Sequence, residues 1–236
     1  MGSTTDYDYT YFRIPKESPD IASYAEKYRQ LRLAALQLSP TSFSSTYEIE
    51  STFSDQTWIA RLTAPEKQTF ICVARPRVTE TAAAAGTTDN HHEVVSGEWV
   101  AQVTILGPLS VADFNLPEES GQPAGSEDEE RWQMLSLYTL PAYRGRGIAK
   151  DLCREVFRYL ATARQEAIAI RVRIMVKPEN QATVSMYRNL GFVDAGRCTL
   201  AEALRANGDA DMVPSDGGGE KFNKRGGLIM TLSLRR

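Results

Sequence analysis

The sequence has few of the residues that build metal centres and disulfide frameworks. Of its 236 residues, three are cysteine and two are histidine. The cysteines, Cys72, Cys153 and Cys198, are odd in number and widely separated, which argues against a disulfide framework and gives no zinc-ligand spacing. We therefore predict no metal site, and we expect each cysteine to be a small buried apolar side chain in a reducing compartment.

Basic charge and long apolar runs are also scarce. Lys and Arg number 27 against 30 Asp and Glu, so the net charge is −3 and the pI ≈ 5.6, without the basic stripe of a nucleic-acid binder. No apolar run approaches the roughly 20 residues that cross a bilayer. The first residues lack the apolar stretch of a secretory signal, and Asp6 stands where myristoylation needs Ser or Thr. We expect no nucleic-acid or membrane partner and a cytoplasmic location, with the nucleus left open.

The hydrophobic share of 42% is enough for a sizeable core, and its periodicity predicts an α+β chain. A helix is expected between Ser18 and Pro40, with Leu38 on its apolar face and the Ser18-Pro19-Asp20 run supplying its cap. Arg171 and Arg173 are expected to form a charged sheet face or to pair with a loop acid. Strands are predicted at 9–14, 70–74, 98–106, 132–140, 167–176, 192–200 and 227–234, and further helices near 43–62, 147–163 and 180–189.

Three inserts stand apart from this pattern because they are rich in Gly, Ala, Ser and acids. They are residues 79–97, 112–129 and 206–221, and we predict that they are flexible loops on one domain spanning 1–236. His91 and His92 lie in the first insert and are expected to be exposed spacers. The acidic run at 127–130 is either a solvated loop or a surface that attracts a cationic acceptor such as a polyamine.

The stretch YRGRGIAKDL (143–152) lies between a predicted strand and a predicted helix. Backbone N–H groups at a helix N-terminus lack internal partners, and the helix dipole favours an anion there. Gly145 and Gly147 would let a diphosphate approach these N–H groups, while Arg144 and Arg146 add positive charge. The pattern therefore predicts a phosphate site, with a plain strand-to-helix turn as the alternative.

This turn and a later segment together resemble the GCN5-related N-acetyltransferase (GNAT) superfamily. The family's acetyl-coenzyme A (acetyl-CoA) signature, Gln/Arg-x-x-Gly-x-Gly/Ala, is matched by Arg144, Gly147 and Ala149. Its second mark is an asparagine after the fifth strand, a tyrosine seven residues later, and then Gly-Phe. Asn180, Tyr187, Gly191 and Phe192 match that mark, so the resemblance covers roughly 133–193.

The resemblance implies a GNAT-type mixed, mostly antiparallel sheet of six to seven strands, flanked by helices and splayed between strands 4 and 5. The pantetheine arm of acetyl-CoA is expected in the gap, and no metal is implied. The residues expected to bind acetyl-CoA are Leu137, Tyr138 and Thr139 for pantetheine, Arg144, Gly145, Arg146, Gly147, Ile148, Ala149 and Lys150 for the diphosphate, and Asn180 and Tyr187.

The activity that the resemblance implies is transfer of an acetyl group from acetyl-CoA to a primary amine, by direct attack in a ternary complex. An amine with a pKa of about 10.4 is neutral only to roughly one part in 10³ at pH 7, so a base would help. Tyr187 is expected beside the sulfur, as a proton donor to the leaving thiolate; the alternative is a core aromatic residue packed on Leu190 or Phe192. Asn180 could instead only cap its helix.

The general base is the weakest part of the match. Some family members carry a glutamate five residues before the asparagine, and Met175 stands there in this chain. Glu98, Glu130 and a water on backbone carbonyls are the candidates, and each glutamate could equally be a solvated surface residue. A small-molecule amine is the first choice of acceptor, because the chain has long loops and no recognisable targeting module. The alternatives are a peptide or protein acceptor, and a non-catalytic CoA-binding sensor; the oligomeric state is left open.

Overall fold

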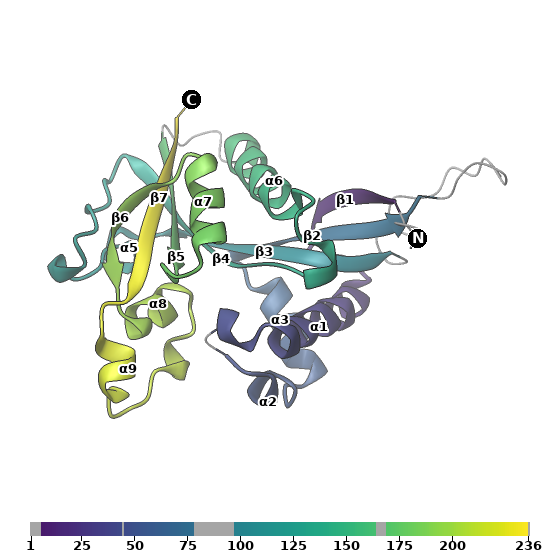
Figure 1. The fold of residues 1–236 in the computed structure, drawn as a ribbon, viewed down its shortest axis with the longest axis horizontal. Coiled ribbons are helices and arrows are strands. Elements are labelled where there is room, and N and C mark those ends of the chain that lie inside the picture. The colour runs from purple at the N-terminus through teal and green to yellow at the C-terminus, as the bar shows by residue number, and fades with distance from the viewer. Residues whose placement is uncertain (1–5, 44, 78–96, 164–168, 236) are drawn as a thin grey trace. The chain divides into compact units, whose positions relative to one another are not determined.

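The computed structural model describes residues 6–43, 45–77, 97–163 and 169–235, so His91, His92 and most of the first insert lie outside the described residues. The predicted α+β class and mixed sheet are confirmed: seven strands follow the order β1-β2-β3-β4-β5-β7-β6, and β4 and β5 are parallel (Figure 1). The strands are β1 (Tyr7–Arg13), β2 (Lys67–Pro76), β3 (Glu98–Leu109), β4 (Glu129–Thr139), β5 (Ala169–Val176), β6 (Val193–Cys198) and β7 (Gly227–Arg235).

The chain divides into two compact units. Unit 1 comprises Met1–Val103 and Leu137–Glu155, and unit 2 comprises Thr104–Ser136 and Val156–Arg236. The expectation of a single domain stays a prediction. The helices of unit 1 are α1 (Ile21–Leu38), α2 (Tyr47–Glu50), α3 (Asp55–Thr63) and the short η1 (Pro40–Ser42) and η3 (Pro141–Tyr143), and α6 (Ile148–Ala163) begins there. Unit 2 holds α5 (Val111–Phe114), η2 (Glu118–Ser120), α7 (Gln181–Asn189), α8 (Leu200–Ala206), η4 (Ala210–Met212) and α9 (Gly219–Asn223).

The core of unit 1 forms where α1 and α3 pack against the antiparallel pair of strands β1 and β2. Tyr24, Tyr28 and Leu31 recur at three- and four-residue spacing on α1, and all three are buried with Trp58 of α3 and Trp99 of β3. Two details of the predicted helix are wrong. Leu38 is 60% exposed, because α1 ends there, before Pro40. The helix begins at Ile21, so Pro19 precedes its first turn, and the N-cap Asp20 makes no side-chain capping bond.

In unit 2, β5 lies between β4 and β7. Ile170, Val172 and Ile174 alternate along β5 and are buried, as the sequence predicts. The parallel pairing of β4 with β5 runs only from Glu129–Ala169 to Gln133–Arg173, whereas β7 pairs with β5 along its whole length. The ladder between the fourth and fifth strands is therefore interrupted after Gln133, in agreement with the expected splay.

The two later inserts contain regular structure. Residues 112–129 include most of α5, all of η2 and the first residue of β4, and residues 206–221 include η4 and the start of α9. Arg171 pairs with an acid, Glu129, at 3.0 Å, but this acid lies on β4 and not in a loop. The expectation of an acidic partner is wrong for Arg173, which is fully buried and has no carboxylate partner within the described part of the chain. Neutral acceptors replace the acid there, because the backbone of α5 passes over the guanidinium and offers the Phe114 carbonyl.

Candidate functional site

The turn between β4 and α6 has the geometry of an anion site. Gly145 and Gly147 adopt φ of +77° and +83°, a conformation that side chains other than glycine disfavour. A Cβ on Gly145 would meet nothing within 4 Å, and one on Gly147 would meet only the Asp151 carboxylate at 3.8 Å. The first helical bond runs from the Asp151 N–H to the Gly147 carbonyl, so the N–H groups before it have no helical partner. The turn is thus open and rich in unused donors.

Arg144 braces this turn from within unit 1. Its Nε donates to the Thr139 carbonyl at 3.0 Å and its Nη2 donates to Ser39 Oγ at 3.1 Å. Ser39, the C-cap residue of α1, also bonds the Tyr138 hydroxyl at 2.9 Å. Two of the predicted cofactor residues, Tyr138 and Arg144, are therefore tied to the same serine. No pattern in the sequence pointed to Ser39.

Arg146 extends toward tyrosines of β1 and η3. Its Nη1 donates to the Tyr9 hydroxyl at 3.0 Å, and its guanidinium lies 5.5 Å from the Tyr7 ring centroid and 5.7 Å from that of Tyr143. Both predicted arginines thus have defined contacts. Arg144 donates to a backbone carbonyl and a serine and lies 5.3 Å from the Tyr138 ring centroid, whereas the contacts of Arg146 among the described residues are with tyrosines.

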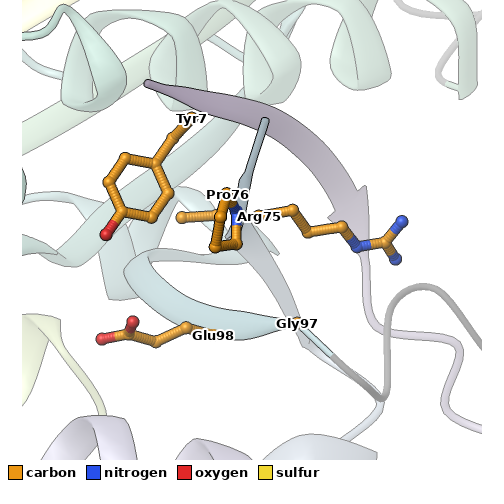
Figure 2. A pocket seen from close by; sticks show the side chains of 6 residues that line it. Tyr7, Arg75, Pro76, Gly97 and Glu98 are labelled. Carbon is orange, nitrogen blue, oxygen red and sulfur yellow. The ribbon is translucent and has the colours of Figure 1, made fainter. Parts of the chain in front are cut away.

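Glu98, one candidate base, belongs to the same neighbourhood. The Tyr143 hydroxyl donates to Glu98 Oε2 at 2.6 Å, and burial together with this bond raises the pKa of Tyr143 above its usual value, so the phenol stays a proton donor. A hollow of ≈ 320 Å³ lies beside it, lined by Tyr7, Gly97 and Glu98 among others. Figure 2 shows the Tyr7 hydroxyl and the Glu98 carboxylate on the same side of this hollow, with the Arg75 guanidinium directed away.

An acid in the first turn of α6 was missed by the sequence reasoning, although it stands in the quoted stretch. Asp151 accepts from Arg154 at 2.8 Å and from the Tyr11 hydroxyl at 3.4 Å. Its negative charge would oppose an anion at the turn, and Arg154 offsets that charge. Because Arg154 offsets the charge of Asp151, Arg144 and Arg146 can give the turn a net positive charge that favours an anion.

Unit 2 carries the second motif on α7. Asn180 caps the helix by accepting from the Thr183 N–H at 3.3 Å. The helix ends in a Schellman arrangement, with N–H bonds from Gly191 to the Arg188 carbonyl and from Phe192 to the Tyr187 carbonyl. Tyr187 is 5% exposed, and its ring packs edge-on against Phe192 at 5.2 Å. The cap and the core packing are real, and the cofactor and catalytic roles of Asn180 and Tyr187 stay predictions.

The remaining predicted positions lie along the same elements. Glu130, the other candidate base, accepts from the Trp132 indole at 3.2 Å. Met175, at the family's glutamate position, packs with Ala195, Cys198 and Ile229. Leu137, Ala149 and Lys150 are partly exposed, whereas Tyr138, Thr139 and Ile148 are buried.

Strand β4 holds one feature that no pattern in the sequence announced. Ser136 adopts φ of +56°, and it is the only non-glycine residue with a positive φ in the described ranges. Such a conformation costs roughly 1–2 kcal/mol for a residue with a Cβ. It falls where unit 2 gives way to unit 1 along this strand. Strain of this kind often marks a functional site.

The described residues contain neither a cluster of metal ligands nor a membrane-spanning helix. No group of three or more His, Cys, Asp or Glu side chains lies close enough to hold a metal ion. In the described ranges, no helix combines the length and apolarity that a bilayer crossing requires.

Several solved structures share the fold of this chain. A putative acetyltransferase from Acinetobacter baylyi ADP1 has a TM-score of 0.54 at 14% identity, over 98% of this chain and 95% of that one. An acetyltransferase of the GNAT family from Streptococcus pneumoniae has a TM-score of 0.53 at 12% identity, over 96% and 99%. Arabidopsis thaliana NAA60 in complex with acetyl-CoA also has 0.53, at 17% identity, over 96% and 99%. At these identities the likenesses show the fold.

No curated protein matches the sequence. The model of the acetyltransferase (GNAT) family, however, matches residues 35–192, which is more than half of the 236 residues. The chain therefore belongs to the acetyltransferase (GNAT) family.

Proposed function

We propose that the protein is an acetyl-CoA-dependent N-acetyltransferase that acetylates a primary amine, by direct attack in a ternary complex, and that the acceptor is a small molecule. The observation that carries this proposal is the β4–α6 turn. Gly145 and Gly147 are left-handed and open, and they precede a helix of 16 residues whose first N–H groups have no helical partner.

Acetyl-CoA fits the residues present. The backbone of residues 145–150 would hold the diphosphate, and the end of β4 from Leu137 to Thr139 would hold the pantetheine arm. An acidic ligand suits this turn, because two arginines stand in it and no side chain fills the space above Gly145. Bound there, acetyl-CoA would supply an acetyl group activated as a thioester.

The chain's own residues then handle protons. Glu98 and Glu130 are the candidates to take the proton of the amine. Glu98 accepts a hydrogen bond from Tyr143 and Glu130 accepts one from Trp132, and an ionised carboxylate has about four acceptor positions, so neither bond prevents this role. Tyr187 would donate toward the leaving sulfur. A phenol with a pKa of about 10 is a weaker acid than a thiol near 8.5, so complete transfer is uphill by only about 2 kcal/mol.

The acceptor is identified by release of CoA thiol from acetyl-CoA. The purified protein is incubated with polyamines, arylalkylamines, amino sugars, amino acids and short peptides. We expect release with one class of small amine. Release with peptides alone would overturn the small-molecule acceptor. No release across the panel, with CoA binding confirmed by calorimetry, would favour the non-catalytic sensor.

Gly147→Glu tests the phosphate site. A carboxylate at this position would occupy and repel the diphosphate, so we expect at least about 100-fold weaker CoA binding. Gly121→Glu is the matched control, because Gly121 also has a positive φ, of +70°, and open space around its missing Cβ, but it follows η2 in unit 2 and is not part of the turn. Equal CoA affinity for wild type and Gly147→Glu would contradict the assignment of the turn.

Tyr187→Phe tests the proton donor. We expect a lower turnover number and a CoA affinity within a few-fold of wild type, because the ring and its contact with Phe192 are kept. Tyr159→Phe serves as the control, because Tyr159 is a partly exposed tyrosine of α6. Unchanged turnover in Tyr187→Phe would show that the tyrosine is structural.

A further inference from the structure

Arg146 is held by three tyrosines beside the phosphate turn. Tyr9 accepts from its Nη1 at 3.0 Å, and the rings of Tyr7 and Tyr143 flank the guanidinium at 5.5 and 5.7 Å. Tyr7 and Tyr143 also contact each other edge-on at 5.3 Å, which fixes the two rings relative to one another. The side chain is exposed, yet its direction is set by an aromatic frame from β1 and η3.

The positive charge of Arg146 is not neutralised by these contacts. Within the described part of the chain, no carboxylate lies within ion-pair distance of its guanidinium, whereas Arg77 has two such partners and Arg154 has one, both in unit 1. Donation to Tyr9 uses one of the five N–H groups of a guanidinium. The aromatic contacts orient the group without consuming its charge or its other donors.

The two arginines of the turn therefore differ in what they offer a ligand. Arg144 donates from Nε and Nη2 into the protein, to Thr139 and Ser39, and so holds the turn together. Arg146 presents an oriented cation one residue before Gly147. A guanidinium with unused donors in a fixed plane suits the oxygens of a phosphate.

CoA carries two separate anionic groups on one ribose: the diphosphate at the 5′ position and a single phosphate at the 3′ position. This inference rests on the proposed function, which gives the diphosphate to the backbone of the turn. We propose that Arg146, oriented by Tyr7, Tyr9 and Tyr143, binds the 3′-phosphate of CoA. The protein then distinguishes CoA from dephospho-CoA, which lacks that phosphate alone.

The test compares CoA with dephospho-CoA by calorimetry on four proteins. Wild type should bind CoA about 10- to 100-fold more tightly, the range expected for charge-assisted bonds to one phosphate. Arg146→Met should bind both compounds with the dephospho-CoA affinity of wild type. Arg144→Met should weaken both alike, because it loosens the turn. Arg77→Met, a surface arginine already paired with Asp6 and Asp8, should change neither.

Tyr9→Phe gives a second readout of the frame. It keeps the ring and removes the phenol that accepts from Arg146, so CoA binding should weaken about three-fold while dephospho-CoA binding stays at the wild-type value. The inference is overturned if wild type binds both compounds equally, or if Arg146→Met weakens both by the same factor. Failure of wild type to bind either compound would instead overturn the proposed function.

Discussion

Each unit buries a charged cluster, and the two clusters are built on different principles. In unit 1, Glu50 of α2 is fully buried between two arginines. Arg32 of α1 donates to it from Nε at 3.0 Å and Nη2 at 2.6 Å, and Arg61 of α3 donates at 3.0 Å. The carboxylate thereby joins three helices, and opposite charges meet inside the unit.

In unit 2, Arg173 of β5 is equally buried but meets only neutral acceptors among the described residues. It donates to the side-chain oxygens of Gln133 at 2.6 Å and Gln122 at 2.9 Å and to the Phe114 carbonyl, and the Phe114 ring lies 4.3 Å from the guanidinium. Gln133 in turn donates to Asn207, beyond the end of α8, at 3.0 Å. The Arg173 guanidinium thus connects β5 with Gln133 of β4 and with the segment that contains Phe114 and Gln122.

The difference appears in the pKa of each group. Burial alone would raise the pKa of Glu50, but the hydrogen bonds and charges of Arg32 and Arg61 outweigh burial and lower it. Burial lowers the pKa of Arg173 to about 10, because the opposing electrostatic effect of Cys198 is smaller than that of burial, and Arg173 still carries its charge at neutral pH. Unit 1 neutralises a buried charge, whereas unit 2 uses amide and carbonyl dipoles to tolerate one.

The largest effect is expected from Glu50→Gln. The amide keeps the shape of the side chain but leaves two guanidinium groups facing it without a counter-charge. Breaking a buried ion pair in this way costs about 3–5 kcal/mol of unfolding free energy. Urea denaturation measures it, with Glu48→Gln, an exposed glutamate on the same helix, as the control. A loss below about 1 kcal/mol would mean that the cluster of unit 1 is not paired as described.

Arg173→Met should lower the free energy of unfolding by less than Glu50→Gln does, by about 1–3 kcal/mol. The acceptors on Gln133, Gln122 and Phe114 lose a donor, at about 1–3 kcal/mol for each group left unsatisfied, but removing a buried cation returns part of that cost. Arg171→Met, at a partly exposed neighbour on β5, is the control. The contrast between the clusters would fail if Arg173→Met cost more than Glu50→Gln.

Lowering the pH should abolish the contribution of Glu50 to the free energy of unfolding but not that of Arg173. The pKa of Glu50 is lower in the folded than in the unfolded state, so its stabilisation is present above its ordinary value of 4.5 and is lost as the pH falls through the folded pKa. The slope cannot exceed about 1.4 kcal/mol per pH unit for one group. Denaturation from pH 7 to pH 3 should bring wild type and Glu50→Gln together while Arg173→Met stays apart.

The sequence predicted the structural features that depend on residues close to one another in the chain. Ile170, Val172 and Ile174 alternate along β5 and are buried, the apolar spacing of α1 and α6 matches their buried faces, and the glycines of the β4–α6 turn take the left-handed conformation that the motif requires. The segment from Asn180 to Phe192 folds as one capped helix for the same reason. Local backbone preferences and periodicity carry this information.

Contacts between distant residues were not predictable. No sequence pattern indicates that Arg173 contacts Gln122 and Phe114 rather than an acid, because these two residues lie 51 and 59 positions away in the chain. The same holds for Ser39, which meets Arg144, and for the tyrosines of β1 that surround Arg146. The positive φ of Ser136 also has no local cause, because serine does not favour it.

The smallest and most selective effect is expected in the rates at which the buried thiols are labelled. Since the thiols are divided between the two units, these rates measure the opening of each unit separately. Cys72 and Cys153 lie in unit 1 and Cys198 in unit 2, and each is at most 1% exposed. Burial raises the pKa of Cys72 and Cys153 to about 12 and that of Cys198 to about 11, so a thiol reagent at pH 8 should label them only after local opening. If the units open independently, Arg173→Met should speed labelling of Cys198 about ten-fold for each 1.4 kcal/mol lost, and Glu50→Gln should do so for Cys72. Equal acceleration at all three cysteines in either variant would show that the clusters stabilise one cooperative whole.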